Sequence, residues 1–191
     1  MYDKDNKPHR SALRKGRVSS PDQAYFITKC TLVPGDKFLA SSDCAQAVVD
    51  SLLWMRDNQW CRILGFVVMP DHYHMAIGLH SAKSLSELIA SLDKYTASRI
   101  NRSLGRRGAF WEEGFYDHAI RDRKDFNSIL DYIHNNPVAA GLIDEPEGWP
   151  YSTANPKYAS EIDWDWLGPS MPEIIYAEHR FSVNHLPNRY R

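Results

Sequence analysis

Two histidines separated by one tyrosine are the residues of this sequence best suited to chemistry. His72 and His74 follow a Pro-Asp break in the apolar stretch GFVVMPDHYHMAIGL, residues 65–79. In an extended strand, residues two apart point to the same face, so both imidazoles share a face with the small residues Ala76 and Gly78. Imidazole nitrogens bind divalent cations, and small neighbours leave room beside them. The pattern indicates a metal site, while ordinary packing or surface roles stay open.

A tyrosine on a later segment is the second candidate for chemistry. Apolar residues recur at helical spacing from Phe126 to Ile133, which predicts a helix. Tyr132 and Asn136 lie on one flank of its apolar stripe, roughly 110° and 70° from the centre. A tyrosine hydroxyl has a pKa of about 10 and needs a base or a metal to become a nucleophile at neutral pH. Half-buried packing of the ring is the alternative role.

The remaining apolar patterns predict the elements that position these groups. Aromatic and β-branched residues favour strands, whereas i, i+3, i+4 spacing favours helices. An almost continuous apolar run is typical of a buried central strand, and the short Pro70-Asp71 break predicts a hairpin. We therefore expect a strand at 24–32, a helix from Ser41 or Ser42 to about 58, a central strand at 61–69 and then the histidine strand. A helix from Ser84 follows, with Tyr95 in its apolar stripe, and then a strand within 110–120. The last element is a helix from about 123 that Asn136-Pro137 breaks or kinks.

The first six of these elements follow the order βαββαβ. This order is that of a ferredoxin-like sandwich, an α+β fold with an antiparallel sheet and helices on one face. The additional helix carries Tyr132. We expect a basic arm at residues 1–20, a catalytic domain at 21–143 and an irregular tail at 144–191 packed on it. Residues 1–143 hold 19 Lys and Arg against 16 Asp and Glu, whereas 144–191 hold 4 against 8, as in a phosphate-binding surface with a compensating tail.

Composition narrows the class of protein. The chain has 191 residues, enough for one domain with its own core. Cys30, Cys44 and Cys61 form no CxxC pair, so we expect neither disulfides nor a zinc ribbon and favour a reducing compartment. The polar N-terminus and the short apolar runs predict a cytoplasmic protein without a signal peptide or membrane span.

Three strings occur in order: MPDHYH, FWEEGFYDHAIR and DYIHNNPVAAGL. Together they resemble the REP-associated tyrosine transposases, relatives of the single-tyrosine HUH transposases. The resemblance implies a ferredoxin-like fold, His72 and His74 as metal ligands, Tyr132 as the catalytic nucleophile and Asn136 as a third metal ligand. The wider group usually carries Gln at that last position. Mg²⁺ or Mn²⁺ suits phosphate chemistry best.

The resemblance implies nicking and strand transfer of single-stranded DNA with REP-like hairpins, through a 5′-phosphotyrosine link, by a monomer or homodimer. The alternatives are a metallohydrolase in which Tyr132 is only structural, and a nucleic-acid-binding module without catalysis. Clustered cations and nearby aromatic residues are typical of DNA contacts, although each cation taken singly is an ordinary surface charge. The expected DNA-binding residues are Arg10, Arg14, Lys15, Arg17, Arg99, Arg102, Arg106, Arg107, Trp111 and His118.

Overall fold

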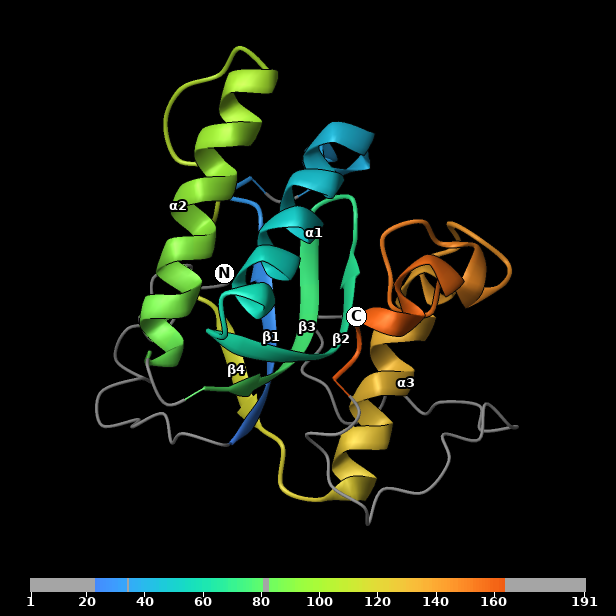
Figure 1. Cartoon of the computed structure of the whole chain (residues 1–191). Helices are drawn as coiled ribbons and strands as arrows, with labels where there is room; N and C mark the ends of the chain where they lie inside the picture. Colours follow the sequence, from blue (N-terminus) through green and yellow to red (C-terminus); the bar gives the residue numbers. More distant parts are fainter. Residues whose placement is uncertain (1–22, 34, 81–82, 164–191) are drawn as a thin grey trace, which may run out of the picture.

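The computed structural model describes residues 23–33, 35–80 and 83–163. The expected basic arm, with Arg10, Arg14, Lys15 and Arg17, lies outside the described residues, as do residues 164–191 of the expected tail. Three helices, four strands and short 3₁₀ turns form the part that is described (Figure 1).

The sheet has the strand order β2-β3-β1-β4, and every neighbouring pair is antiparallel. This order and the preceding sequence of elements confirm the predicted ferredoxin-like α+β fold. β2 and β3 form the predicted hairpin across Pro70-Asp71. The strands are β1 (Ala24–Cys30), β2 (Cys61–Val68), β3 (His72–Leu79) and β4 (Tyr116–Ala119).

The helices lie on both faces of the sheet. α1 (Ser42–Asp57) and α2 (Leu85–Ser103) lie side by side over one face (Figure 1), where they bury an apolar cluster with Tyr73, Met75 and other residues of β1 and β3. α3 (Arg123–Ala139) covers the opposite face through a second apolar cluster. Alternate residues of β3 therefore face different layers, as the sequence predicted.

Polar caps fix where two of the helices begin. Ser84 and Glu87 form a reciprocal capping box at the start of α2. Asp122 accepts a hydrogen bond from the Asp125 amide and caps α3, whose start at Arg123 agrees with the predicted start at about residue 123. Of the predicted break or kink at Asn136-Pro137, the break is wrong, because α3 continues through a buried Pro137 to Ala139; the kink stays a prediction. Burial of the apolar face of α3 outweighs the single hydrogen bond that proline removes from its last turn.

One further expectation is corrected inside the α1/α2 layer. Tyr95 is 58% exposed instead of belonging to the apolar stripe of α2. Thr96 is buried in its place, where its hydroxyl hydrogen-bonds the indole of Trp111. The three cysteines are free, as expected. None of the helices among the described residues is long and apolar enough to cross a membrane.

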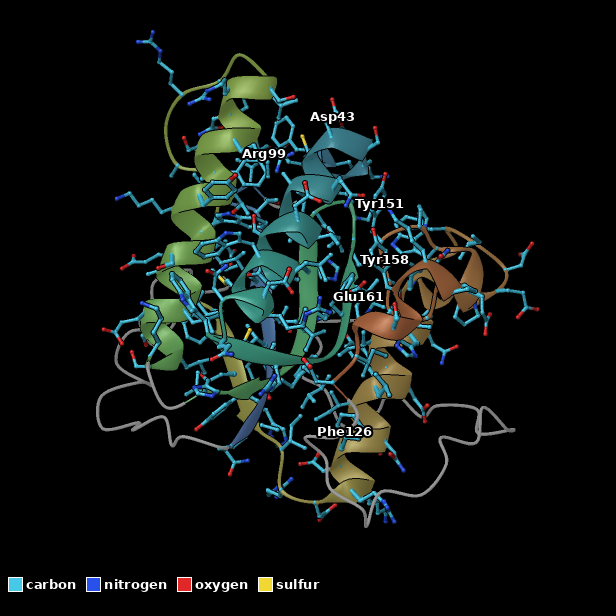
Figure 2. All side chains as sticks on the ribbon, in the orientation of Figure 1. Asp43, Arg99, Phe126, Tyr151, Tyr158 and Glu161 are labelled. Carbon is cyan, nitrogen blue, oxygen red and sulfur yellow. The ribbon has the colours of Figure 1, made fainter. Side chains whose placement is uncertain are left out.

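β2 is an edge strand rather than the predicted central strand. The helix layers bury the side chains on its two faces, and residues 149–163, here called the edge segment, run along its outer edge. The Val68 amide donates to the Tyr151 carbonyl at 2.9 Å, and the Thr153 amide donates to the Phe66 carbonyl at 3.0 Å. Figure 2 shows Tyr151, Tyr158 and Glu161 beside β2. A covered edge offers no free strand for unwanted pairing, and a strand buried this way reads in sequence as a central one.

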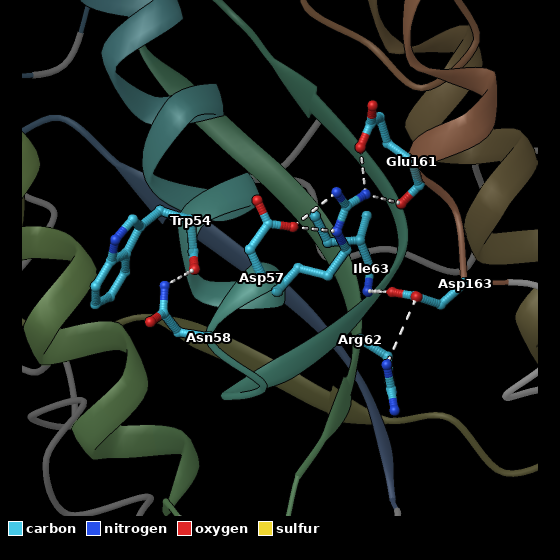
Figure 3. A network of polar contacts seen from close by, with 8 residues as sticks. Trp54, Asp57, Asn58, Arg62, Ile63, Glu161 and Asp163 are labelled. Carbon is cyan, nitrogen blue, oxygen red and sulfur yellow. Dashed lines mark hydrogen bonds and ion pairs between the residues drawn. The ribbon is translucent and has the colours of Figure 1, made fainter.

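Charged side chains bind the C-terminal end of the edge segment to β2 and α1 (Figure 3). Asp163 accepts a hydrogen bond from the Ile63 amide at 2.8 Å, and its own amide donates back to the Ile63 carbonyl at 2.8 Å. Glu161 pairs with Arg56 of α1. The edge segment thus contacts both β2 and the α1 layer.

Candidate active site on the α3 face of the sheet

The register of β1 and β3 brings the candidate residues onto one face. Thr28 pairs with His74, and Cys30 pairs with His72. Directly opposite residues of an antiparallel pair point to the same side of the sheet. This side is the face that α3 covers, since Phe26 and Ala76, a cross-strand pair in the same register, belong to its apolar cluster.

The two histidines converge through the same ring nitrogen. Their Nε2 atoms lie 3.1 Å apart, and Nδ1 of His72 lies 2.7 Å from the Asp71 carboxylate. The hydrogen bond to His72 holds the pKa of Asp71 below its usual value, so this carboxylate is an acceptor at neutral pH. In the neutral form of the His72 ring, Nδ1 donates to this carboxylate and the lone pair of Nε2 is on the side of the partner imidazole.

His74 is set deeper in the sheet. Its side chain is buried, Nδ1 lies 2.8 Å from the Thr28 hydroxyl, and its ring stacks on Phe26 with centroids 5.5 Å apart. Burial, together with the nearby His72, lowers the pKa of His74 well below its ordinary value. The ring is neutral near pH 7, which is the form that binds a cation.

Tyr132 reaches the same point from α3. Its hydroxyl lies 3.2 Å from Nε2 of His74, and the two ring centroids are 5.0 Å apart. Burial raises the pKa of Tyr132 to about 12, although a side-chain hydrogen bond with Asn136 opposes that shift. One chain therefore brings together four of the predicted groups: His72, His74, Tyr132 and Asn136.

The arrangement of the histidines fits a divalent cation. Ligand nitrogens about 2.1 Å from a metal and roughly at right angles are ~3 Å apart, and the two Nε2 atoms are separated by 3.1 Å. The hydrogen bonds to Asp71 and Thr28 are the outer contacts that usually orient metal-binding imidazoles. No group of three His, Cys, Asp or Glu side chains that could hold a metal occurs among the described residues. Further ligands would have to be the Asn136 amide oxygen, water or substrate oxygens.

His118 lies on the same face of the sheet as the histidine pair, but its side chain contacts α3. It pairs with Phe26 across the β1–β4 ladder, and its Nε2 atom is 2.9 Å from the Asp125 carboxylate in the first turn of α3. Burial raises the pKa of Asp125, but hydrogen bonds from His118 and from the Arg121 amide outweigh it and bring the pKa below its usual value. The structure thus assigns His118 an anchoring contact with the helix that carries Tyr132.

Trp111 lies away from the histidines, in the α1/α2 layer. It is buried, donates its indole N–H to Thr96 at 2.9 Å, and packs edge-on against Tyr73 and Phe110. The ring has no open face for a nucleobase. The expected base-stacking role of Trp111 therefore does not hold, because an aromatic residue beside a short edge strand was needed for the core.

Four of the seven arginines predicted to bind DNA lie on or just beyond α2: Arg99, Arg102, Arg106 and Arg107. Arg99, which Figure 2 labels on α2, pairs with Asp50 of α1 at 3.0 Å, so its charge is partly engaged within the fold. Arg102 and Arg107 are exposed, and Arg106 lies over the ring of Phe38 at 4.4 Å. The next residue after Phe38, Leu39, donates its amide to the Pro70 carbonyl at the β2–β3 turn. This chain of contacts places Arg106 at the end of the sheet where β3 begins.

The fold defines a class of protein: a ferredoxin-like sheet with a tyrosine-bearing helix over one face, as expected of tyrosine transposases. The sequence profile of the family described as "Transposase IS200 like" matches residues 36–136, more than half of the chain. The chain belongs to this IS200-like transposase family. The resemblance to REP-associated tyrosine transposases is thereby confirmed at the level of the family.

Individual relatives agree with this assignment. A REP-associated tyrosine transposase of Escherichia coli K12 is 30% identical over 124 residues, covering 64% of this chain and 73% of the relative. A Haemophilus influenzae Rd protein described as a candidate REP-associated tyrosine transposase is 32% identical over 112 residues, covering 53% of this chain. The chain spans 64% of the length of that relative.

One solved structure shares the fold. It is described as a REP-associated tyrosine transposase bound to a REP hairpin, and it superposes with a TM-score of 0.63 at 24% identity. The match covers 87% of this chain and 97% of the solved chain. At this identity the likeness supports the fold alone.

Sequence reasoning missed three residues that shape the site. Asp71 was read only as part of a turn, although a carboxylate directly before the histidine pair is a signal for an orienting contact. Thr28 and Phe26 touch His74 from β1. Their roles depend on the register between strands 40 and more residues apart, for which the sequence carries no local signal.

Proposed function

We propose that the protein is a divalent-cation-dependent endonuclease and strand transferase for single-stranded DNA that forms hairpins. The observation that carries this proposal is the 3.2 Å contact between the Tyr132 hydroxyl and Nε2 of His74, beside the converging Nε2 of His72. A nucleophile next to a group that can hold a cation or accept a proton is what phosphoryl transfer requires.

In this mechanism, the Tyr132 oxygen attacks the scissile phosphorus. A bond forms between that oxygen and phosphorus, giving a 5′-phosphotyrosine. The bond from phosphorus to the 3′ oxygen breaks, and that oxygen takes a proton to become a free 3′-hydroxyl. Since one phosphoester replaces another, the bond energy is retained, and a second attack by a 3′-hydroxyl rejoins DNA without ATP.

The residues of the chain prepare the nucleophile. The Asn136 side chain hydrogen-bonds the Tyr132 hydroxyl, and that hydroxyl lies 3.2 Å from Nε2 of His74. These two contacts fix the direction of the oxygen before the substrate arrives. The raised pKa of Tyr132, about 12, means that the oxygen keeps its proton at neutral pH until the site helps to remove it.

His72 and His74, with Asn136 as the third ligand, would hold Mg²⁺ or Mn²⁺. When bound, the cation supplies positive charge that stabilises the phenolate and the phosphate oxygens. The second contacts from Asp71 and Thr28 keep the two Nε2 lone pairs directed at the same point.

The proposed substrate follows from the relatives and from the charge pattern. A solved relative is described as bound to a REP hairpin, and Arg102, Arg106 and Arg107 supply cations for a phosphate backbone. Arg106 lies at the end of the sheet that carries His72. Arg10, Arg14, Lys15 and Arg17 remain predicted DNA contacts. The catalytic domain at 21–143 and the cytoplasmic location also remain predictions.

A single chain holds both the histidines and Tyr132, so a monomer has a complete site and a homodimer is not required for one.

The test is the covalent link itself. Wild-type protein is incubated with a hairpin-bearing oligonucleotide and Mg²⁺ or Mn²⁺, and a slowly migrating protein–DNA adduct is expected on a denaturing gel. Tyr132→Phe should give no adduct and no cleavage while still binding the hairpin.

Two outcomes would support other functions. Cleavage that persists in Tyr132→Phe would contradict the covalent mechanism and favour a metallohydrolase that uses only the histidines. Hairpin binding by the wild type without adduct or cleavage would favour a nucleic-acid-binding module.

A further inference from the structure

We infer that Thr153 and His134 form a clasp that ties α3 to β2 and so positions Tyr132 against the histidines. The inference rests on the proposed function for its catalytic consequence, but the clasp itself is a feature of the fold. The two residues act through α3 and are positioning residues, because neither is part of the His72, His74 and Tyr132 cluster.

The Thr153 hydroxyl is the centre of the clasp. It accepts the Phe66 amide at 2.9 Å, donates to the Phe66 carbonyl at 3.2 Å, and lies 2.9 Å from Nε2 of His134. Both side chains are buried. A hydroxyl donates one hydrogen bond and accepts two, so the His134 nitrogen must donate here.

The clasp contacts α3 on the side opposite Tyr132. Residues two apart on a helix point roughly 200° apart, so His134 faces the edge segment while Tyr132 faces the sheet histidines. Between these two directions, Leu130 and Ile133 pack into the apolar cluster under α3. A methyl group on Gly65 of β2 would overlap the Leu130 side chain, which shows how closely the helix approaches the strand.

The other end of α3 is held separately. His118 of β4 bonds Asp125 in the first turn of the helix. The clasp holds the second half, where both Tyr132 and Asn136 lie. A displacement of about 1 Å in a reacting group can reduce a rate by ~100-fold, so the second attachment sets the rate of the attack more than the first.

The experiment compares substitutions that remove the clasp with one that keeps it. Thr153→Val removes the hydroxyl and retains the shape, whereas Thr153→Ser keeps the hydroxyl. His134→Leu removes the bond from Thr153 to α3 and leaves the contacts between Thr153 and Phe66. The matched control is Tyr158→Phe, which removes the hydroxyl that the edge segment directs at Gln46 on the α1 side.

The readouts are the single-turnover rate of adduct formation at saturating hairpin, the hairpin affinity, and amide hydrogen exchange along α3. Thr153→Val and His134→Leu should each lower the rate by about 10- to 100-fold, with hairpin affinity within about twofold, and should speed exchange in residues 123–139 more than in α1. Thr153→Ser and Tyr158→Phe should stay close to wild type. An equal rate with unchanged α3 exchange in both clasp variants would overturn the inference.

The outcomes separate this inference from the proposed function. Absence of adduct in the wild type would contradict the proposed function, yet the exchange measurement would still test the clasp. If Thr153→Val does not fold, His134→Leu answers the same question, since it leaves the bonds between the edge segment and β2 intact. A normal adduct in wild type and in His134→Leu alike would contradict the clasp alone.

Discussion

Alternating residues of β1 and β3 form the two faces of these strands, and the buried polar groups on the two faces differ in their hydrogen-bonding arrangement. On the α1/α2 face, Lys29 is buried and its ammonium bonds Asp93 at 2.6 Å and the carbonyls of Glu112 and Gly114 at 2.7 Å each. All three of its protons are used within the fold. On the α3 face, the Nε2 atoms of His72 and His74 point at each other, an arrangement that a cation would complete.

Because of this difference, the Lys29 face contributes to stability and the histidine face is available for chemistry. A saturated buried cation holds three segments together and has nothing left for a ligand. Two oriented lone pairs next to a hydroxyl add little to stability and are available to a cation or a substrate. Substitutions on one face should therefore change folding, and substitutions on the other should change activity.

The largest effect is expected from Lys29→Met. The change leaves the partly buried Asp93 without its cation and two carbonyls without their donor, so the free energy of unfolding should fall by about 3–5 kcal/mol. Urea denaturation followed by circular dichroism measures it. The double variant Lys29→Met, Asp93→Leu should recover most of the loss; a double variant as unstable as the single one would mean that the packing, not the charge, is what matters.

His72→Ala should instead remove the cation while preserving the fold. The side chain is partly exposed at the rim of the site, so the urea midpoint should change little. Mn²⁺ affinity measured by calorimetry should fall by on the order of 100-fold, and adduct formation should fall with it. Chelation of the wild type with EDTA should have the same effect, reversed by Mg²⁺ or Mn²⁺. Undiminished Mn²⁺ binding in the variant would remove His72 from the proposed ligand set.

A smaller, pH-dependent effect is expected from Asp125→Asn. Because the pKa of Asp125 is lowered in the folded state, its carboxylate stabilises the protein above its unfolded-state pKa of about 4. That contribution disappears as the pH falls through the folded-state value. The variant should be less stable than the wild type by about 1–2 kcal/mol at pH 7, and the difference should shrink toward pH 3 in urea titrations. A difference that grows on acidification would contradict this assignment.

The smallest effect is expected from Tyr73→Phe. Tyr73 lies between the two histidines in sequence but on the opposite face, and its buried hydroxyl has no hydrogen-bond partner among the described residues. Its removal should leave adduct formation unchanged and alter the free energy of unfolding by less than about 1 kcal/mol, toward greater stability. A loss of activity comparable with that of Tyr132→Phe would show that the two faces are not separate.

Much of the fold was predictable because local patterns carry it. Alternation in β3 separated the histidines from Tyr73 and Met75, and the caps at Ser84 and Asp122 marked the starts of α2 and α3. The predictions failed where a distant segment decided the outcome. β2 has the apolar pattern of a central strand because helices bury both of its faces. The edge segment covers its outer edge, and that segment has no strong periodicity of its own.

The sequence by itself determined which groups could do chemistry: the histidine pair through its spacing of two, and Tyr132 with Asn136 through their spacing of four on a helix. Only the tertiary structure decided that these pairs meet. The meeting depends on the register of β1 against β3, which supplies Thr28 to His74, and on the attachment of α3 through His118 and Thr153. Contacts between residues far apart in the chain follow from how whole surfaces pack, and no local pattern of residues encodes them.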